Sequence, residues 1–224
     1  MAPIKVYGWA MSPWMSRTLV CLEEANADYE IVPMSRSAGD HRLPEYLAIN
    51  PFGEIPALED GDLTLFQSRA ISRYILRKFK PEFLREGNLR ESAMVDAWVD
   101  VQAHKLEPIL RPIVFNCIIN QLVGNDRDQD VVDDSIEKLK KLLEVYEARL
   151  SSSKYLAGDF LSFAEFTHFA FMRYFMVTEY YADVVDAYPH FKAWWEALLS
   201  RPSVKKVMAG MPPDFGVGSG KIPS

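Results

Sequence analysis

The sequence contains little cysteine, no long apolar run and no surplus of positive charge. Its two cysteines, Cys21 and Cys117, are too few and too far apart for a disulfide framework, a Cys-x-x-Cys redox pair or a structural zinc site. No stretch reaches the roughly 20 consecutive apolar residues that a membrane-spanning helix needs. The 31 acidic residues outnumber the 25 lysines and arginines and give a net charge of -6, which disfavours nucleic acid and anionic membranes as partners.

The N-terminal residues also lack targeting features. Residues 1–6 contain neither the apolar run of a secretory signal nor the arginine-rich character of a transit peptide, so we expect a cytosolic location. Hydrophobic residues make up 49% of the 224 residues, which is enough for a buried core without disulfides. We therefore expect a globular, metal-free protein whose two cysteines belong to the core.

Residues 1–80 alternate strand-like and helix-like segments. The turn signal Asp60-Gly61-Asp62 predicts a hairpin between the last two strands. The predicted order β-α-β, α, β-β-α is that of a thioredoxin-like domain, although the pattern alone leaves several small α/β folds open. The expected strands are residues 4–9, 29–32, 57–59 and 63–65, and the expected longer helices are residues 15–26 and 68–79.

Beyond residue 80 the pattern is helical only. Apolar residues at steps of three and four from Val132 to Leu150 predict one amphipathic helix. Ser162 and Glu165 form a Ser-x-x-Glu capping box before an aromatic-rich segment, which predicts a centrally buried helix. The expected organisation is a thioredoxin-like domain over residues 1–80, a linker over 81–90, an all-helical bundle domain over 91–210 and a mobile tail over 211–224.

The join between the first strand and the first helix holds the most informative run, Met11-Ser12-Pro13-Trp14-Met15-Ser16-Arg17. Ser12 occupies a helix N-cap position and Pro13 the first turn, where its missing N–H has no cost. By these residues alone, Ser12 needs no role beyond capping. No G-x-S-x-G turn surrounds it, so a nucleophilic serine has little support.

Seven segments of the chain form an ordered set of motifs: residues 1–12, 22–24, 50–57, 60–71, 144–150, 155–159 and 188–195. These motifs resemble those of plant phi-class glutathione S-transferases. The resemblance spans residues 1–208, and the order and spacing of its pieces make it specific. It implies a thioredoxin-like domain followed by a helical bundle, and a homodimeric enzyme that conjugates glutathione to hydrophobic electrophiles and reduces organic hydroperoxides as a second activity. Glutathione is then a co-substrate, with no further cofactor.

The resemblance also assigns roles to individual residues. Ser12 would donate a hydrogen bond to the sulfur of glutathione and favour the thiolate, with Ser16 as the local rival. The glutathione-binding residues would be His41, Arg42, Glu54, Ile55, Pro56, Gln67 and Ser68. Among these, Ile55-Pro56 resembles a cis-proline turn that pairs with the cysteinyl backbone. Ser68, which would hold the γ-glutamyl carboxylate, has capping of the third helix as its simpler alternative.

Two positions depart from the family pattern. Glu54 stands where the family usually has Gln, and Gln67 stands where it usually has Glu. Either Glu54 now answers the ammonium group of glutathione, or Gln67 binds it as a neutral acceptor with lower affinity.

The second substrate would meet an apolar pocket formed by Met11, Trp14, Phe115 and Ile119, each of which is otherwise ordinary core. Phe52 lies in a turn and is large and apolar, and the resemblance implies that it inserts into the neighbouring subunit. The competing function is a non-catalytic carrier that holds flavonoids or other small aromatic ligands in the apolar pocket.

Overall fold

The computed structural model describes residues 2–9, 11–122 and 124–211. Its N-terminal part holds a four-stranded sheet with the strand order β2-β1-β3-β4. β1 pairs in parallel with β2 and antiparallel with β3, which in turn pairs antiparallel with β4. The strands are β1 (Ile4–Gly8), β2 (Tyr29–Pro33), β3 (Ala57–Asp60) and β4 (Leu63–Phe66). This order confirms the predicted thioredoxin-like domain.

Two long helices and two short helical segments complete this part of the chain. The longer ones pack against each other, and each of them buries apolar side chains, among them Leu19 and Leu22 in the first and Ile71 and Ile75 in the second. Residues 34–43 contain one short 3-10 turn. The helices are α1 (Pro13–Glu24), η1 (Asp40–Arg42), α2 (Pro44–Ile49) and α3 (Ser68–Phe79).

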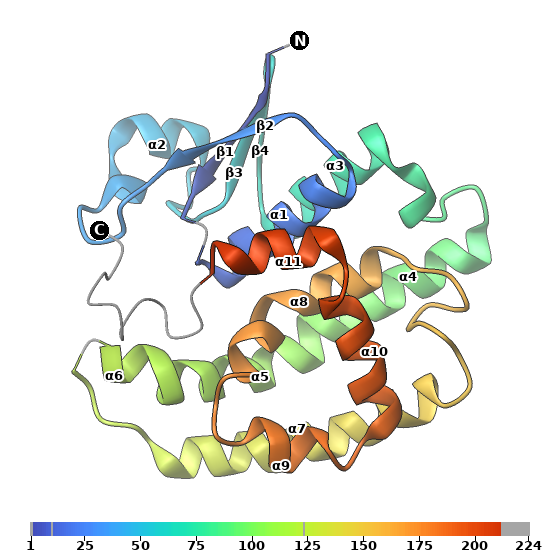
Figure 1. Cartoon of the computed structure of the whole chain (residues 1–224). Helices are drawn as coiled ribbons and strands as arrows, with labels where there is room; N and C mark the ends of the chain where they lie inside the picture. The colour runs from blue at the N-terminus through green and yellow to red at the C-terminus, as the bar shows by residue number, and fades with distance from the viewer. Residues whose placement is uncertain (1, 10, 123, 212–224) are drawn as a thin grey trace.

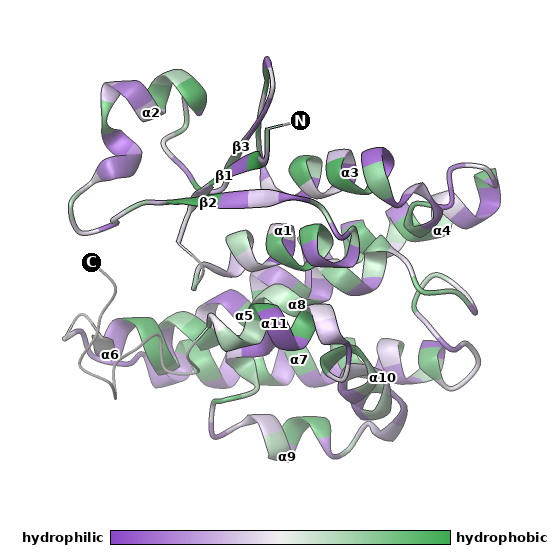
Figure 2. Cartoon of the chain, turned by 45° about the horizontal axis from the view of Figure 1, so that its top comes forward, coloured by the Kyte–Doolittle hydropathy of each residue, from purple (hydrophilic) through white to green (hydrophobic). Residues whose placement is uncertain are grey.

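The rest of the described chain is helical, as predicted (Figure 1). All residues of α8 are buried, and α8 packs against α1, α4 and α5, so it is the central helix of the molecule. Figure 2 shows apolar and hydrophilic positions alternating along the outer helices. The helical segments are η2 (Pro81–Phe83), α4 (Leu89–Val101), η3 (Gln102–Leu106), α5 (Glu107–Val114), η4 (Phe115–Ile119), α6 (Asn120–Leu122), α7 (Gln129–Leu150), α8 (Phe163–Phe175), α9 (Tyr181–Val185), α10 (Pro189–Leu199) and α11 (Pro202–Ala209).

Local sequence signals predicted the start of α8 and the buried face of α7. Ser162 and Glu165 form the reciprocal capping box at the start of α8, with Glu165 accepting from the Ser162 N–H at 2.9 Å. The apolar stripe of α7 is buried along its whole length, from Val132 to Leu150. Both predictions are confirmed, and so is the burial of Cys21 and Cys117.

Proline explains where the helices depart from expectation. Residues 89–122 form one continuous helical run in which two π-helical turns, η3 and η4, flank α5. Pro108 and Pro112 cannot donate a hydrogen bond to the carbonyl four residues earlier, so the α-helical hydrogen-bond ladder is interrupted within this run. Pro202 begins α11, because proline suits the first helical turn.

The segment predicted as a linker is partly helical. Within residues 81–90, η2 forms one turn and α4 begins at Leu89. Of the predicted tail, Met211 is fully buried and accepts a hydrogen bond from Arg173 at 3.3 Å, whereas residues 212–224 lie outside the described residues. The domain limits therefore remain predictions.

Candidate glutathione and electrophile site

Ser12 ends the loop that leads from β1 into α1. It is the N-cap of α1, and its Oγ accepts a hydrogen bond from the Met15 N–H at 3.4 Å. Its side chain is almost fully buried, and its own N–H donates to the Trp9 carbonyl at 3.0 Å. Within the described part of the chain, no protein acceptor takes the Ser12 hydroxyl proton. This proton is therefore available to a ligand at the positive end of α1.

Ser16, the rival serine, lies one turn further along α1 and is fully buried. Its Oγ donates to the Pro13 carbonyl at 2.8 Å. The Ser16 proton is thus already used within the helix, which favours Ser12 as the donor to a bound sulfur.

The loop before Ser12 is held by the helical bundle. The Tyr174 hydroxyl, from the central helix α8, donates to the Met11 carbonyl. Trp14 contacts the same helix through an edge-to-face arrangement with Phe171, with ring centroids 5.3 Å apart. Met11 and Trp14, both predicted pocket residues, therefore lie where the two parts of the molecule meet.

The structure contains a buried polar network that the sequence analysis did not predict. Arg17 is fully buried, and its guanidinium donates to the Ser68 Oγ at 2.7 Å and to Glu107 at 2.8 Å. Arg69 donates to Gln102 and to Glu107, each at 2.6 Å. The signal for this network was a charged residue within an otherwise apolar helix, but its partners lie 51 and 90 residues away.

Charge balance keeps this network ionised. Burial, together with the neighbouring Arg69, lowers the pKa of Arg17 to about 10. Burial alone would raise the pKa of Glu107, but Arg17 and Arg69 outweigh it and lower that pKa. Glu107 also accepts from the Trp14 Nε1 at 3.0 Å and from Gln102 at 3.2 Å, so four side chains donate to one carboxylate.

Ser68 is the first residue of α3, and Gln67 is the N-cap. The expected alternative, in which Ser68 caps its helix, is not what the structure shows, because no side chain caps α3. The Ser68 Oγ instead accepts from Arg17, so its proton can go to a ligand carboxylate. The first N–H groups of α3 have no side-chain cap, and free N–H groups at the start of a helix can bind an anion.

The predicted turn around Pro56 is ordered by its neighbours. The Ile55-Pro56 peptide bond is cis, as the resemblance implies. Tyr46 and Asn50 both donate to the Glu54 carbonyl, at 2.7 and 2.5 Å. The two family departures, Glu54 and Gln67, meet at this turn, because the Gln67 Nε2 donates to the Glu54 Oε2 at 3.4 Å.

His41 and Arg42 lie on η1, which packs against the same turn. A Cβ at Gly53 would lie 2.9 Å from the His41 carbonyl, so only glycine allows this approach, and Gly53 has a φ of 58°. Burial, followed by the charges of Arg42 and Arg36, lowers the pKa of His41. Arg42 is exposed, so it is the cation of the pair that faces solvent.

The remaining predicted residues lie at two other places. Phe115 and Ile119 begin and end the π-helical turn η4 and are both half-buried. Phe52 is 66% exposed, and its ring lies 5.6 Å from that of Phe66. An aromatic side chain so exposed in one chain is consistent with an expected intersubunit contact, which stays a prediction.

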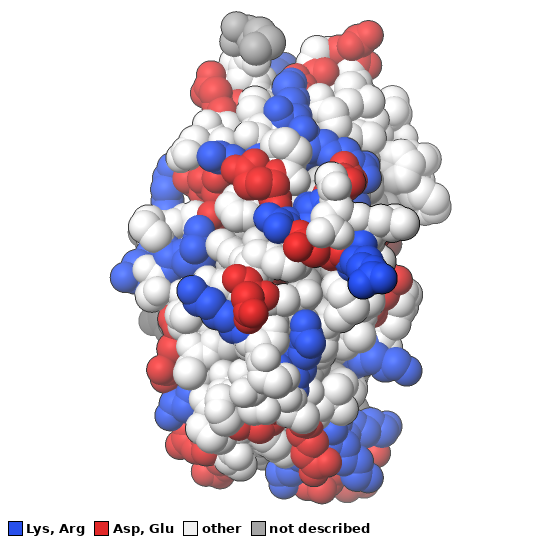
Figure 3. Space-filling view, turned by 90° about the vertical axis from the view of Figure 1, so that its right-hand side faces the viewer, with Lys and Arg blue, Asp and Glu red and all other residues white. Residues whose placement is uncertain are grey.

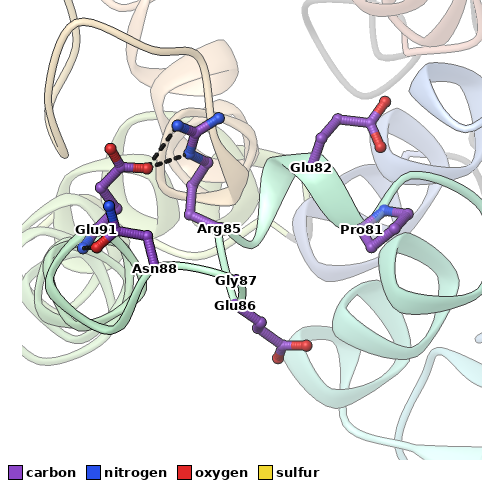
Figure 4. Close-up of a pocket in the computed structure, with 7 residues that line it drawn as sticks. All are labelled: Pro81, Glu82, Arg85, Glu86, Gly87, Asn88 and Glu91. Carbon is purple, nitrogen blue, oxygen red and sulfur yellow. Dashed lines mark hydrogen bonds and ion pairs between the residues drawn. The ribbon is translucent and has the colours of Figure 1, made fainter.

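A separate pocket of about 410 Å³ lies in the predicted linker and contains none of the predicted site residues. Figure 4 shows its lining residues, with Arg85 paired to Glu91. Acidic and basic side chains are interspersed on the face shown in Figure 3. Among the described residues, no cluster of three or more His, Cys, Asp or Glu side chains could hold a metal ion, and none of their helices has the length and apolar character to cross a bilayer.

Comparisons with known proteins agree with this geometry. Residues 2–77 match the family model "Glutathione S-transferase, N-terminal domain", and residues 106–202 match the model of the C-terminal domain. Glutathione S-transferase 4 of Zea mays is 57% identical over 97% of this chain and 96% of its own length. The probable glutathione S-transferase GSTF1 of Oryza sativa subsp. japonica is also 57% identical, over 95% of this chain and 99% of its own length.

Solved structures give the same result. Glutathione S-transferase I in complex with an atrazine glutathione conjugate superposes with a TM-score of 0.91 at 55% identity, over 95% of this chain and 99% of the other. Glutathione transferase F7 from Populus trichocarpa superposes with a TM-score of 0.89 at 51% identity, over 93% and 99% of the two chains. The chain therefore belongs to the glutathione S-transferase family and, within it, to the plant phi class.

Proposed function

We propose that this protein conjugates the glutathione thiolate to hydrophobic electrophiles, with Ser12 stabilising the thiolate. The observation that carries the proposal is the hydrogen bonding of the Ser12 hydroxyl. Its oxygen accepts from the Met15 N–H at the N-terminus of α1, and among the described residues no acceptor takes its proton, which can therefore bond to a ligand. The Ser12 hydroxyl would donate a hydrogen bond to the sulfur of glutathione, and this bond would be stronger to the thiolate than to the thiol.

The energies are adequate without a general base. A free thiol titrates near ~8.5, and lowering its pKa by about two units takes about 2.7 kcal/mol. A hydrogen bond to a charged group contributes about 1.5–3 kcal/mol, and a helix N-terminus adds about 0.3–1 kcal/mol. The thiolate sulfur then attacks the electrophilic carbon, and the leaving group departs with the bonding electrons.

The other contacts would hold glutathione in one orientation. Ser68 and the uncapped start of α3 would bind the γ-glutamyl carboxylate, while Glu54 and Gln67 would meet the ammonium group. The backbone of Ile55, before the cis Pro56, would pair with the cysteinyl unit, and His41 and Arg42 would meet the glycyl carboxylate. Each assignment rests on the family resemblance and on the proximity described above.

The relatives indicate the chemical class of the second substrate, and not the individual compound. One related structure, of glutathione S-transferase I, holds lactoylglutathione, and another, of glutathione S-transferase I from maize, holds an atrazine glutathione conjugate. The atrazine conjugate supports hydrophobic electrophiles, herbicides among them, as substrates here. Met11, Trp14, Phe115 and Ile119 would form the pocket. Reduction of organic hydroperoxides would use the same thiolate. A homodimer joined through Phe52 and a cytosolic location are further parts of the proposal, and neither nucleic acid nor a membrane is an expected partner.

The decisive experiment measures steady-state conjugation of glutathione to 1-chloro-2,4-dinitrobenzene beside binding of a fluorescent apolar dye. We expect turnover by the wild type. In Ser12→Ala we expect a loss of turnover and of the ultraviolet absorbance of the thiolate, with glutathione still bound. Ser16→Ala is the matched control and should lose less. Dye binding without turnover would establish the carrier function instead, and unchanged turnover in Ser12→Ala would exclude the role of Ser12.

A further inference from the structure

One face of the helix formed by α5 and η4 lies beside the ring of Trp14, two residues after Ser12. Glu107, Arg111 and Phe115 are spaced four residues apart, so they follow one another along the same helix face. Glu107 accepts from the Trp14 Nε1 at 3.0 Å, and the Arg111 guanidinium lies 5.8 Å from the Trp14 ring centroid. This face therefore adjoins the wall expected to receive the second substrate.

The Arg111 guanidinium lies near two of the predicted pocket residues at once. It is 5.3 Å from the Phe115 centroid as well as 5.8 Å from that of Trp14. Both distances are within the range in which a cation is attracted to an aromatic face. The two rings thus position the positive charge without neutralising it.

Among the residues that the structure describes, no acidic group pairs with the charge of Arg111. Glu107, one turn earlier, is the natural partner, but its carboxylate already receives Arg17, Arg69, Trp14 and Gln102. Arg111 is exposed, and no ion pair or hydrogen bond joins its side chain to any residue that the structure describes. Its N–H groups remain free to bind a ligand anion.

Arg127 shows the opposite arrangement and serves as a comparison. Its guanidinium also lies over an aromatic ring, 5.1 Å from the Tyr180 centroid. Its charge, however, is paired with Glu179 at 2.6 Å. Stacking on a ring is therefore common to both arginines, and the missing carboxylate distinguishes Arg111.

We propose that the second-substrate site of this protein prefers aromatic electrophiles that carry an anionic group, which Arg111 binds. The inference rests on the proposed function, since it concerns the same pocket. A planar guanidinium matches a carboxylate with two parallel hydrogen bonds. It also offsets the repulsion between an anionic electrophile and the glutathione thiolate that must approach it.

The test compares 4-chloro-3-nitrobenzoate with 4-chloro-3-nitrobenzamide as substrates of the full-length enzyme. In both, the glutathione sulfur bonds to the ring carbon and chloride leaves with the electron pair, so the two differ in charge and not in reaction. The kcat/KM for each is divided by its uncatalysed rate constant with glutathione, which removes the difference in intrinsic reactivity. The quantity measured is the benzoate-to-benzamide ratio of these normalised values.

We expect Arg111→Gln to lower this ratio about tenfold, the order of one charge-assisted hydrogen bond. Arg111→Lys should retain part of it, because the charge remains, and Arg127→Gln should leave the ratio unchanged. An unaltered ratio in Arg111→Gln, with the benzamide still conjugated, would overturn the inference alone. A wild type that conjugates neither compound, nor 1-chloro-2,4-dinitrobenzene, would overturn the proposed function itself.

Discussion

Gln67 donates a hydrogen bond to the carboxylate of Glu54 across 3.4 Å, and these are the two positions at which the chain departs from its family's pattern. Compared with the family pattern, the acid and the amide have exchanged positions in the sequence, yet their side chains contact each other in the structure. The negative charge therefore stays beside the start of α3, carried by the turn before Pro56 instead of by the N-cap residue.

The exchange predicts unequal effects on glutathione affinity. Glu54→Gln removes the only carboxylate of the pair, so we expect its Kd for glutathione to rise about fivefold, a modest value because both side chains are exposed. Gln67→Glu should have a smaller effect, and the double exchange should restore affinity. Calorimetry measures all three. The control ligand is glutaryl-Cys-Gly, which lacks the ammonium group; equal losses of affinity for it and for glutathione would exclude the assigned contact.

Phe52 predicts the oligomeric state. Its side chain is 66% exposed in the single chain, so we expect it to be buried in a neighbouring copy and Phe52→Ala to shift the hydrodynamic mass toward the 25.6 kDa monomer. Sedimentation measures that shift. Val145→Ala is the control, because it shortens another exposed apolar side chain, on α7. A dimer that persists in Phe52→Ala would argue against the contact.

The Arg17 and Glu107 network predicts an asymmetry in stability. Glu107→Ala leaves the fully buried Arg17 without a counter-charge, so the free energy of unfolding should fall by about 3 kcal/mol. Arg17→Met should cost less, because Glu107 keeps Arg69, Trp14 and Gln102 as donors. Chemical denaturation measures both. The double variant should be more stable than Glu107→Ala alone; additive losses would show that the two charges act independently.

Glu165 and His168 predict opposing pH dependences within α8. Burial lowers the pKa of His168 to about 3, so its contribution to stability is lost as the pH falls from about 6.5, where the unfolded chain takes up a proton. Burial raises the pKa of Glu165 to about 7, so its contribution is lost as the pH rises from about 4.5. Between these limits the two slopes have opposite signs, each at most about 1.4 kcal/mol per pH unit.

Removing either group should expose the slope of the other. Relative to the wild type, His168→Gln should gain stability on acidification between pH ~6.5 and ~4.5, and Glu165→Gln should lose it. Melting temperatures measured across this window give the two differences. Parallel curves for all three proteins would contradict the assignment.

The sequence predicted those features of the fold that depend on contacts between residues close together in the chain. Ser12, Ser162 and Glu165 occupy helix ends, where a side chain meets a backbone group within three residues. The α7 stripe is likewise a matter of spacing along one helix. These elements and the thioredoxin-like order were predictable from the chain itself.

Long-range polar contacts were not predictable in the same way. Nothing adjacent to Arg17 indicates that its charge meets Glu107, which lies 90 residues later. Arg111 lacks an ion pair because the carboxylate of Glu107 already accepts from four other side chains. That too could be seen only in the three-dimensional structure. The two π-helical turns η3 and η4, on either side of α5, are likewise not indicated by the spacing of apolar residues.

The hydrogen bond from Tyr174 to the Met11 carbonyl spans 163 positions of the chain. During translation, the first strands and helices leave the ribosome long before the tyrosine that secures the loop of Ser12. The first strands and helices can fold early, but the loop of Ser12 acquires this anchor only after Tyr174 has left the ribosome. A nascent chain stalled before that point would carry the serine without the support that holds it in place.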